Sequence, residues 1–578
     1  MLALTISTLV GRREPAFTPA SLFTSSEQGA WYDPSDFSTL YQNSAGTTAV
    51  TTVEQPVGLM LDKSKGLVLG SELVNYAAFV SVDPSWTIGA NSISAVNGIN
   101  YGAYQITLLS GKFYKVTVTV TAYTSGTIRV RLNTFDIGIA LSGLGTQTGY
   151  GYSNGTPLYV MGDGSFTGTV TISVKELPGN HAYQSTSTAR PVLRARYNAL
   201  TWSEDFSNAY WGTAGRATIL ANTSDTTDPL GGNTADKMVE AAPSGTHRVQ
   251  ANGASSAATG IASSSVKASV YFKKGTRDWG WVAATDSAAN GATAWFDLAN
   301  GVAGTVSLSG TGSGASSQIS SVGNGWYRCT LTVTPHTSSG DVFAYYGITT
   351  GDAVNSYAGD ITKHIYIWGA QLVAANVFPS NVYQRIEAAP TGNGTVTYAT
   401  GADYPNYLYF DGSDDSLSTA SIDFSATDEM SVFAGLTKNN DAALQIIYEL
   451  SANLNNNNGT FHHFINSNAG LNYGSKGDLT VGINVTSGFA SPVTLITTGR
   501  SDISADFVSL RANKIEIASS TADQGSGNYG NYPLYIGSRA GTSLRFNGRL
   551  YGLIVRGKTS TLDEITSTET WMSGKTGV

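Results

Sequence analysis

Charged residues, cysteines and long apolar runs are all scarce in this sequence. Asp, Glu, Lys and Arg make up 13 % of the 578 residues, about half the share usual in globular proteins, which excludes a coiled coil as the main architecture. The single cysteine, Cys329, cannot form an intrachain disulfide, so a disulfide scaffold is excluded. No run of about 18 apolar residues occurs, and the apolar stretch 1–10 is too short and lacks preceding basic residues, so neither a membrane span nor a secretory signal is expected.

Basic residues are also in the minority. The chain has 33 Lys and Arg against 41 Asp and Glu, a net charge of −8, and no basic run that could follow a phosphate backbone. Nucleic acid is therefore not an expected partner. Glycine is abundant, at 65 residues, but no G-X-Y repeat accompanies it, which excludes collagen. At about 150 residues per domain, the length predicts roughly four domains.

A two-residue alternation of apolar and polar side chains dominates the chain. It is clearest in residues 115–123, 127–132, 169–174 and 364–368, and each run is typical of a half-buried strand. Clusters of Gly, Ser, Thr and Asn separate the runs, as turns between antiparallel strands require. The pattern predicts an all-β protein of tandem antiparallel β-sandwiches.

One short helix is predicted at the C-terminus. Thr561 and Glu564 have the spacing of a capping box, and Leu562, Ile565 and Met572 follow near helical spacing. We expect this helix to pack on the last sandwich. Residues 27–40 form a second candidate, interpreted as a turn that leads into a short helix.

The chain repeats itself at the scale of a domain. Segment 73–86 opens with Leu, Phe and Trp and is closed by the alternating run 171–177. Segment 200–211 opens in the same way and is closed by residues 365–372. Two sandwiches of similar plan are therefore expected to follow one another.

Two parts of the chain resemble known families. Residues 269–277, 296–298, 322–329 and 365–372 resemble, in that order, a jelly-roll module common in virion proteins of tailed bacteriophages and similar to carbohydrate-binding modules. Residues 409–415, 534–537 and 546–552 resemble a concanavalin A-like, laminin-G-type lectin sandwich. The resemblance implies two jelly rolls followed by a lectin-like tip.

The N-terminal region resembles the start of phage minor structural proteins. The similarity lies in residues 27–36 and 57–64, and in that family a motif like Gly179–Ala182 soon follows. Here the first jelly roll intervenes, so residues of about 70–178 are interpreted as an insertion. We predict that the segment after Gly179 packs beside residues before Gly70.

These features divide the chain into six parts. They are an N-terminal virion-anchoring segment (1–69), a first jelly roll (70–178), a connector (179–198), a second jelly roll (199–378), a connector (379–403) and a concanavalin A-like lectin sandwich (404–578).

The sequence matches two functional motifs, but in each case the neighbouring elements that the motif requires are missing. Residues 151–155 fit a nucleophile elbow but lack the flanking strand and helix, and residues 525–530 fit a dinucleotide fingerprint but precede a strand. A glycosidase needs two carboxylates across a cleft, which spacing cannot show, and the repeated coils of a parallel β-helix are not detected. A non-enzymatic protein is expected.

Binding candidates are acidic residues and aromatic rings near turns. Calcium is the candidate ion for three acidic residues, Asp411, Asp414 and Asp415. His462 and His463 would point to opposite faces of a strand, so a shared metal is not expected. Aromatic rings can stack on sugar rings, or can fill sandwich cores. The glycan-binding candidates are Trp279, Trp281, Tyr404, Tyr407, Tyr529 and Tyr532.

The resemblances imply a bacteriophage virion structural protein, a tail fibre or tail-associated adhesin. It would contact host-surface glycans through many weak sites, with the N-terminal segment gripping other virion proteins and the chain forming a homo-oligomer, taken as a trimer. A location on the tail of the particle is favoured over a location on the head. A capsid decoration protein or head fibre, and a polysaccharide-degrading tail spike, are the alternatives.

Overall fold

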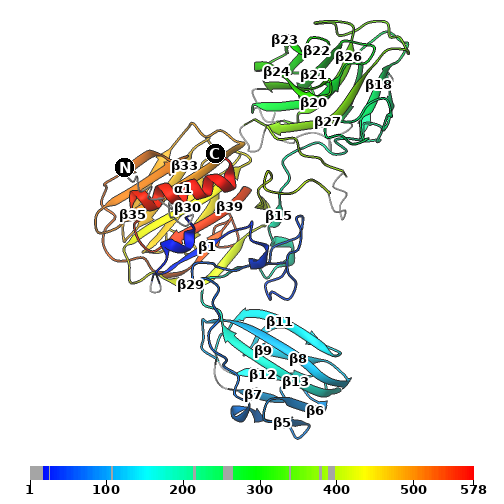
Figure 1. The fold of residues 1–578 in the computed structure, drawn as a ribbon. Coiled ribbons are helices and arrows are strands. Elements are labelled where there is room, and N and C mark those ends of the chain that lie inside the picture. Colours follow the sequence, from blue (N-terminus) through cyan, green and yellow to red (C-terminus); the bar gives the residue numbers. More distant parts are fainter. Residues whose placement is uncertain are drawn as a thin grey trace, which may run out of the picture.

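The computed structural model consists of three lobes joined by short connections (Figure 1). It describes residues 17–24, 27–105, 108–155, 157–212, 216–251, 264–336, 340–375, 381–387 and 397–578. The stretch 1–10 and parts of the connector 379–403 lie outside the described residues. Within the described ranges, sandwiches of antiparallel strands and one C-terminal α-helix confirm the predicted all-β fold. No helix in those ranges is both long and apolar enough to cross a bilayer.

The central lobe is a sandwich of two sheets. One has the order β15-β28-β39-β30-β35-β36-β37, with β1 also paired to β39, and the other has the order β2-β3-β14-β29-β38-β31-β32-β33-β34. The strands are β1 (Gly29–Tyr32), β2 (Leu40–Tyr41), β3 (Leu59–Met60), β14 (Ala182–Tyr183), β15 (Val192–Arg194), β28 (Tyr407–Asp411), β29 (Leu417–Asp423), β30 (Glu429–Lys438), β31 (Gln445–Leu450), β32 (Thr460–Ile465), β33 (Leu471–Lys476), β34 (Thr480–Val485), β35 (Val493–Asp502), β36 (Phe507–Ala512), β37 (Ile515–Ser520), β38 (Asn531–Ile536) and β39 (Asn547–Arg556).

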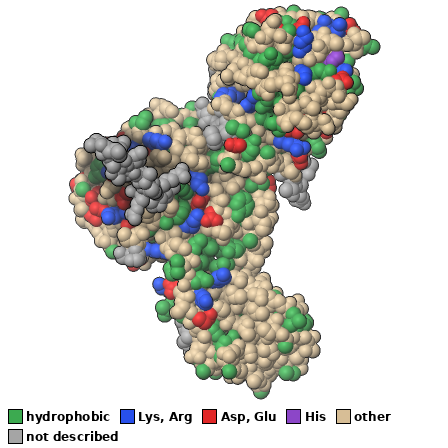
Figure 2. Space-filling model, viewed as in Figure 1, with side chains coloured by type: hydrophobic (Ala, Val, Ile, Leu, Met, Phe, Trp, Pro, Cys, Tyr) green, Lys and Arg blue, Asp and Glu red, His purple; other side chains and the backbone are tan. Residues whose placement is uncertain are grey.

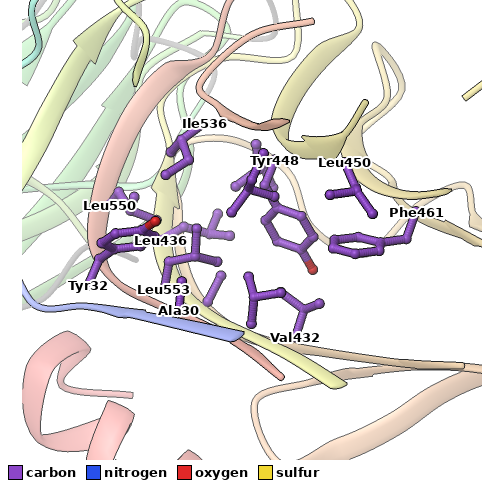
Figure 3. Packing of buried hydrophobic residues seen from close by; sticks show 14 of the residues in the cluster. Ala30, Tyr32, Val432, Leu436, Tyr448, Leu450, Phe461, Ile536, Leu550 and Leu553 are labelled. Atoms are coloured by element: carbon purple, nitrogen blue, oxygen red, sulfur yellow. The ribbon is translucent and has the colours of Figure 1, made fainter. Parts of the chain in front are cut away.

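The core of this lobe lies between the two sheets. Figure 3 shows Val432, Leu436 and Leu553 of one sheet facing Tyr448 and Phe461 of the other, all fully buried. The alternation that predicts half-buried strands works here because each sheet directs every second side chain into this layer.

Three separate stretches of chain build the central sandwich. Besides residues 407–556, it takes β1 to β3 from the N-terminal segment and β14 and β15 from the first connector. Ala182 pairs with Met60, which confirms that the segment after Gly179 packs beside residues before Gly70. Strands of this sandwich are thus formed by residues predicted to be an anchoring segment and a connector.

Asp62 and His181 hold these stretches together. The Asp62 carboxylate accepts hydrogen bonds from the backbone N–H groups of Trp31 (2.8 Å) and Asn180 (2.7 Å), and its own N–H donates to His181 Nδ1 (2.9 Å). Both side chains are fully buried. Burial lowers the pKa of His181, which favours the neutral ring that can accept at Nδ1.

The C-terminal helix α1 (Leu562–Thr576) is capped and packed as predicted. Thr561 and Glu564 form the capping box. The helix lies over the sheet that contains β30, β35 and β39 (Figure 1). Met572 approaches Gly435 so closely that a Cβ there would lie 2.7 Å from its sulfur. The second helix candidate is wrong in part, because residues 29–32 form strand β1 and only a 3₁₀ turn, η2 (Phe37–Thr39), follows.

The first jelly roll packs two five-stranded sheets face to face. Their orders are β10-β9-β12-β7-β4 and β11-β8-β13-β6-β5. The strands are β4 (Val80–Ser81), β5 (Trp86–Ile88), β6 (Ile93–Gly98), β7 (Ala103–Gln105), β8 (Phe113–Ser125), β9 (Ile128–Leu132), β10 (Phe135–Leu141), β11 (Gly145–Tyr152), β12 (Leu158–Gly162) and β13 (Phe166–Glu176).

The second jelly roll has the same plan with six strands per sheet. The orders are β16-β19-β26-β21-β22-β23 and β17-β18-β27-β20-β25-β24. The strands are β16 (Trp211–Gly212), β17 (Ala217–Leu220), β18 (Asp236–Glu240), β19 (His247–Ala251), β20 (Val266–Lys273), β21 (Trp279–Thr285), β22 (Gly291–Asp297), β23 (Val302–Ser309), β24 (Ser313–Gly323), β25 (Trp326–Thr334), β26 (Phe343–Thr349) and β27 (His364–Ala374). Further 3₁₀ turns are η1 (Pro19–Leu22), η3 (Tyr76–Ala78) and η4 (Ser187–Ala189).

Each jelly roll is inserted between paired strands of the central sandwich. The first lies between β3 and β14, which pair with each other, and the second between β15 and β28, which also pair. The jelly rolls extend from opposite sides of the central lobe (Figure 1). The concanavalin A-like region is therefore the hub of the molecule and not the tip expected from the order of domains along the chain.

Candidate functional site

The neck between the second jelly roll and the central lobe is a fixed structure, organised around Gln384. This fully buried side chain accepts hydrogen bonds from the N–H groups of Tyr197 (2.7 Å) and Asn198 (3.2 Å) and donates to the carbonyls of Ala195 (2.6 Å) and Ala399 (2.9 Å). It thereby ties the chain entering the jelly roll to the chain leaving it. Groups on either side of the neck keep a defined geometry.

A cavity of about 410 Å³ opens at this neck, within the size range of small-ligand sites. Three aromatic rings form one side. The Trp368 and Tyr383 ring centroids lie 4.9 Å apart, and the Tyr404 hydroxyl donates to the Tyr383 carbonyl (2.5 Å). The lining residues are Glu204, Asp228, Leu230, Gly232, Thr234, Trp368, Tyr383, Arg385, Ala399 and Tyr404.

Alternation places Trp368 on the side of β27 that faces away from the jelly-roll core, next to this cavity. Ile367 on one side of it and Ala370 on the other both belong to the jelly-roll core. The pairing of β27 with β20 shifts register at Gly369, whose φ of +66° is the left-handed conformation that glycine adopts readily. The alternation of residues 364–368 therefore predicts the strand and the outward side of Trp368, and the bulge after it returns Ala370 to the core. The hollow beside Trp368 is not predicted by alternation.

Hydrogen-bonded polar groups form the other side of the cavity. Glu204 accepts from the Tyr383 hydroxyl (3.1 Å) and from Arg385 Nε (3.2 Å). The Thr234 hydroxyl accepts from Trp368 Nε1 (2.8 Å) and donates to Asp228 (2.9 Å). The polar groups are thus bonded to the rings and hold them in place.

The two carboxylates in this wall have opposite pKa shifts. Burial raises the pKa of Glu204, and the charge of Arg385 offsets only part of that effect. Burial acts in the same direction on Asp228, but hydrogen bonds from the Thr234 and Gly232 N–H groups outweigh it and keep the pKa of Asp228 below its ordinary value. Asp228 is therefore a stable carboxylate, whereas Glu204 is protonated more easily.

A second hollow, of about 380 Å³, adjoins the first at Glu204 and Arg385, which line both. Its other lining residues are Trp202, Asp205, Ile386, Glu387 and Thr397. Arg385 is half exposed and also bonds Glu387 (2.8 Å). The neck thus offers two hollows around one exposed guanidinium group.

Among the aromatic residues predicted to bind glycans, Tyr404 lines the neck cavity. The prediction that Tyr407 and Tyr529 bind glycans is wrong, because both side chains are buried and cannot present a ring to a sugar. The Tyr407 hydroxyl donates to the Arg196 carbonyl (2.6 Å), and the Tyr529 hydroxyl bonds to Ser475 and Ser501 (2.7 Å each). Tyr532 is half-buried against the central core.

Trp279 and Trp281 lie elsewhere, on the outward face of β21. Trp281 is 3 % exposed and pairs across the strands with the buried Trp295, whose Nε1 donates to the Val354 carbonyl (3.3 Å). Trp279 and Tyr345 pack on them, half-buried. This aromatic cluster is separate from the neck cavity.

The predicted acidic cluster does assemble. The carboxylates of Asp411, Asp414 and Asp415 lie within 4.8 Å of one another at the turn that follows β28. Asp415 is 5 % exposed, and burial raises its pKa to about 7. With one oxygen each, three carboxylates supply three of the six to eight oxygens that calcium takes, so the calcium interpretation stays a prediction.

The remaining motifs have structural roles. His462 and His463 are buried, both hydrogen-bond to Asn472, and burial lowers the pKa of each to about 4. Residues 151–155 form the end of β11 and a turn, in which the Ser153 hydroxyl donates to the Gly155 carbonyl (2.6 Å). Signals for the neck cavity are missing from the sequence because the connector that holds Tyr383 and Arg385 has no periodic pattern and alternation does not indicate the hollow beside Trp368.

Comparison with known proteins gives no family assignment. No protein-family profile matches the sequence, and no curated protein matches it. Among solved structures, the CBM40 module of the Ruminococcus gnavus IT-sialidase bound to α2,3-sialyllactose is 17 % identical, with 25 % of this chain and 83 % of that chain covered and a TM-score of 0.22.

Two further solved structures have the same low similarity. The NanB sialidase of Streptococcus pneumoniae is 16 % identical, with 27 % of each chain covered and a TM-score of 0.22. The heptameric SAP-like pentraxin of Limulus polyphemus is 14 % identical, with 26 % of this chain and 76 % of that chain covered, again at 0.22. No ligand or activity is transferred from these distant likenesses.

Proposed function

We propose that this chain is a non-enzymatic virion protein of a tailed phage that binds host-surface glycans, with the neck cavity as one binding site. The observation that carries the glycan part is the pair of rings of Tyr383 and Tyr404 beside Glu204 and Arg385, with the buried Trp368 packed against Tyr383. A sugar ring can lie with its C–H groups on an aromatic face. Its hydroxyl groups can bond to the carboxylate and the guanidinium group at the same time.

The two adjoining hollows suit a ligand longer than one sugar ring. Glu204 and Arg385 stand where the hollows meet, so they would contact the ligand on both sides. Such an exposed site is expected to bind its ligand with low affinity. A dissociation constant of about 1 mM corresponds to about −4 kcal/mol, and repeated copies on one particle would raise the total avidity by about 100-fold or more.

The phage part of the proposal is supported by the N-terminal resemblance. The two motifs that resemble phage minor structural proteins, residues 57–64 and 179–182, meet at the buried Asp62 and His181 pair. A shared structural requirement of this kind accounts for the occurrence of both motifs in one chain. In this proposal the N-terminus contacts other virion proteins, the assembly is a homotrimer and the location is the tail.

Hydrolysis is a second candidate, favoured by one observation. Glu204 and Asp228 share a cavity wall and have opposite pKa shifts, the combination that glycosidases use for acid and base. However, Asp228 is 3 % exposed and already accepts from the Leu230, Gly232 and Thr234 N–H groups. It has little capacity left to act on a substrate, so binding is the better supported function.

An array of bacterial surface polysaccharides and lipopolysaccharides, probed with the full chain, tests the proposal. Tyr404→Ala and Arg385→Ala should each weaken binding to the retained polysaccharide by at least tenfold. Tyr409→Ala, the same substitution at a half-buried ring outside the cavity, is the control. Equal binding by all variants would contradict the site, and new reducing ends released by the wild type but not by Glu204→Gln would favour hydrolysis.

A further inference from the structure

A second hollow lies on the first jelly roll, far along the chain from the neck. Tyr104 of β7 and Tyr159 of β12 are cross-strand partners. Their neighbours Ala103, Leu158 and Val160 are buried in the core, so both tyrosines occupy the outward face of the sheet. The lobe projects away from the hub, and β7 lies toward its free end (Figure 1).

Tyrosine rings surround this hollow, which measures about 390 Å³. The Tyr159 ring centroid lies 5.0 Å from that of Tyr101, nearly perpendicular to it, and 6.1 Å from that of Tyr104. Tyr101 is 42 % exposed and Val82 55 % exposed. Apolar surface of this kind, open to water, favours a ligand with an apolar face.

Polar groups form the rim. Asn133 and Thr134, in the turn between β9 and β10, line the hollow together with the tyrosines. Arg131 donates to the Tyr101 hydroxyl (3.3 Å) and lies 3.6 Å from Asp136. Arg131 therefore holds the Tyr101 ring in place beside the hollow.

The charge around the hollow is balanced. Arg131 is paired with Asp136, and the six lining residues are all uncharged. On the face drawn in Figure 2 the lobe carries mainly neutral side chains, and its charged residues gather near the junction with the hub. An anionic or strongly cationic ligand would find no excess of opposite charge here.

We infer that this hollow, lined by Val82, Tyr101, Tyr104, Asn133, Thr134 and Tyr159, binds a neutral oligosaccharide. A pyranose ring would pack on the tyrosines, and its hydroxyl groups would bond to Asn133 and Thr134. This site is defined by the geometry of the first jelly roll alone and is independent of the neck site. With both sites in use, one chain would hold a polysaccharide at two distant points, and the second contact would be intramolecular.

The test uses the full chain and four neutral probes: cellohexaose, maltohexaose, mannohexaose and xylohexaose. Isothermal titration calorimetry should detect at least one of them. Tyr159→Ala should weaken that binding by at least tenfold. Val82→Arg should do the same by filling the hollow from an exposed position, where folding is not at risk. Tyr123→Ala, on β8 of the opposite sheet, is the matched control and should bind as the wild type does.

The outcomes separate this inference from the proposed function. Binding that is lost in Val82→Arg and kept in Tyr404→Ala supports the hollow of the first jelly roll. Binding that is kept in Val82→Arg and lost in Tyr404→Ala overturns this inference and supports the neck site. Failure of all four probes to bind, or an equal loss in Tyr123→Ala, also overturns it.

Discussion

The two jelly rolls share a plan but are joined to the hub by different chemistry. At the first joint, apolar and aromatic side chains pack together, among them Leu59, Phe113, Tyr150 and Leu177. The Phe113 ring centroid lies 4.3 Å from that of His181. At the second joint, the buried amide of Gln384 bonds to backbone groups of both connecting strands.

This difference explains where a cavity can form. Apolar packing at the first joint fills most of the space between the lobes, since buried side chains close-pack, and leaves a hollow of about 200 Å³ beside Phe113 and Leu177. A joint made of directional hydrogen bonds fixes backbone positions without filling the surrounding volume, and the cavity around Arg385 opens there. The larger hollow of the first jelly roll, of about 390 Å³, lies on an outward sheet face, away from the joint.

The largest expected effect is at the first joint, in Asp62→Ala. The substitution leaves the N–H groups of Trp31, Ser64 and Asn180 without their acceptor in a buried site. At about 1–3 kcal/mol for each unsatisfied group, the central sandwich should lose about 5 kcal/mol. Hydrogen exchange read by mass spectrometry should show faster exchange in β1 and β3.

The control for this prediction is Asp136→Ala, at an exposed carboxylate of β10 in the first jelly roll, which should leave the hub unchanged. The second jelly roll should also keep its protection in Asp62→Ala, because its connections lie elsewhere. Equal destabilisation of both jelly rolls would show that the two joints are not independent.

Asp415 should make the stability of the hub depend on pH. Its pKa of about 7 lies above the value near 4 of an unfolded aspartate. The folded state therefore holds a proton that the unfolded state releases, and the stability falls as pH rises from about 4 to 7. At 1.36 kcal/mol per pKa unit the loss is at most about 4 kcal/mol.

Urea unfolding of wild type and Asp415→Asn at pH 4.5 and pH 8 measures this effect. The variant should be the more stable protein at pH 8 and should lose that advantage at pH 4.5, with both jelly rolls unaffected. Calcium chloride at pH 8 tests the predicted ion: binding would raise the unfolding midpoint of the wild type alone. A pH-independent difference between the two proteins would contradict the raised pKa.

Gln384→Ala should damage the second joint alone. Two backbone N–H groups and two carbonyls lose their partner in a fully buried position, for an expected cost of about 4 kcal/mol at about 1 kcal/mol per group. Tyr383 and Arg385 flank this residue, so ligand binding at the neck should weaken with it. Proteolysis should cut near the neck sooner, whereas Gln147→Ala, at a half-buried glutamine of β11 in the first jelly roll, should leave cleavage at the neck as in the wild type.

How far the sequence predicts this molecule differs between its regions. Alternation predicts the strands of all three lobes, because each strand has one buried face. The insertion of the first jelly roll could be predicted from the motifs on either side of it. The insertion of the second could not, since the short strands β15 and β28 pair through backbone groups that leave no pattern in the sequence.

The candidate sites are less predictable than the fold. Tyr404 could be selected as an aromatic residue near a turn, but the same reasoning selects Tyr407, which is buried three residues later. Exposure of a ring depends on which lobe covers it, and that is a tertiary property. The hollow of Tyr101, Tyr104 and Tyr159 had no signal beyond ordinary strand alternation.

The smallest expected effect comes from removing a single hydrogen bond at each of the two joints. Tyr150→Phe removes the hydrogen bond between the Tyr41 and Tyr150 hydroxyls (3.1 Å) and keeps the rings packed, 5.1 Å apart. Ser264→Ala removes the bond from the Ser264 hydroxyl to the Ser491 carbonyl of the hub (2.7 Å). Each change should cost about 1 kcal/mol. Small-angle scattering should show a wider range of lobe separations for Ser264→Ala only, because aromatic packing still holds the first joint in Tyr150→Phe; a wider range in Tyr150→Phe would contradict the difference between the joints.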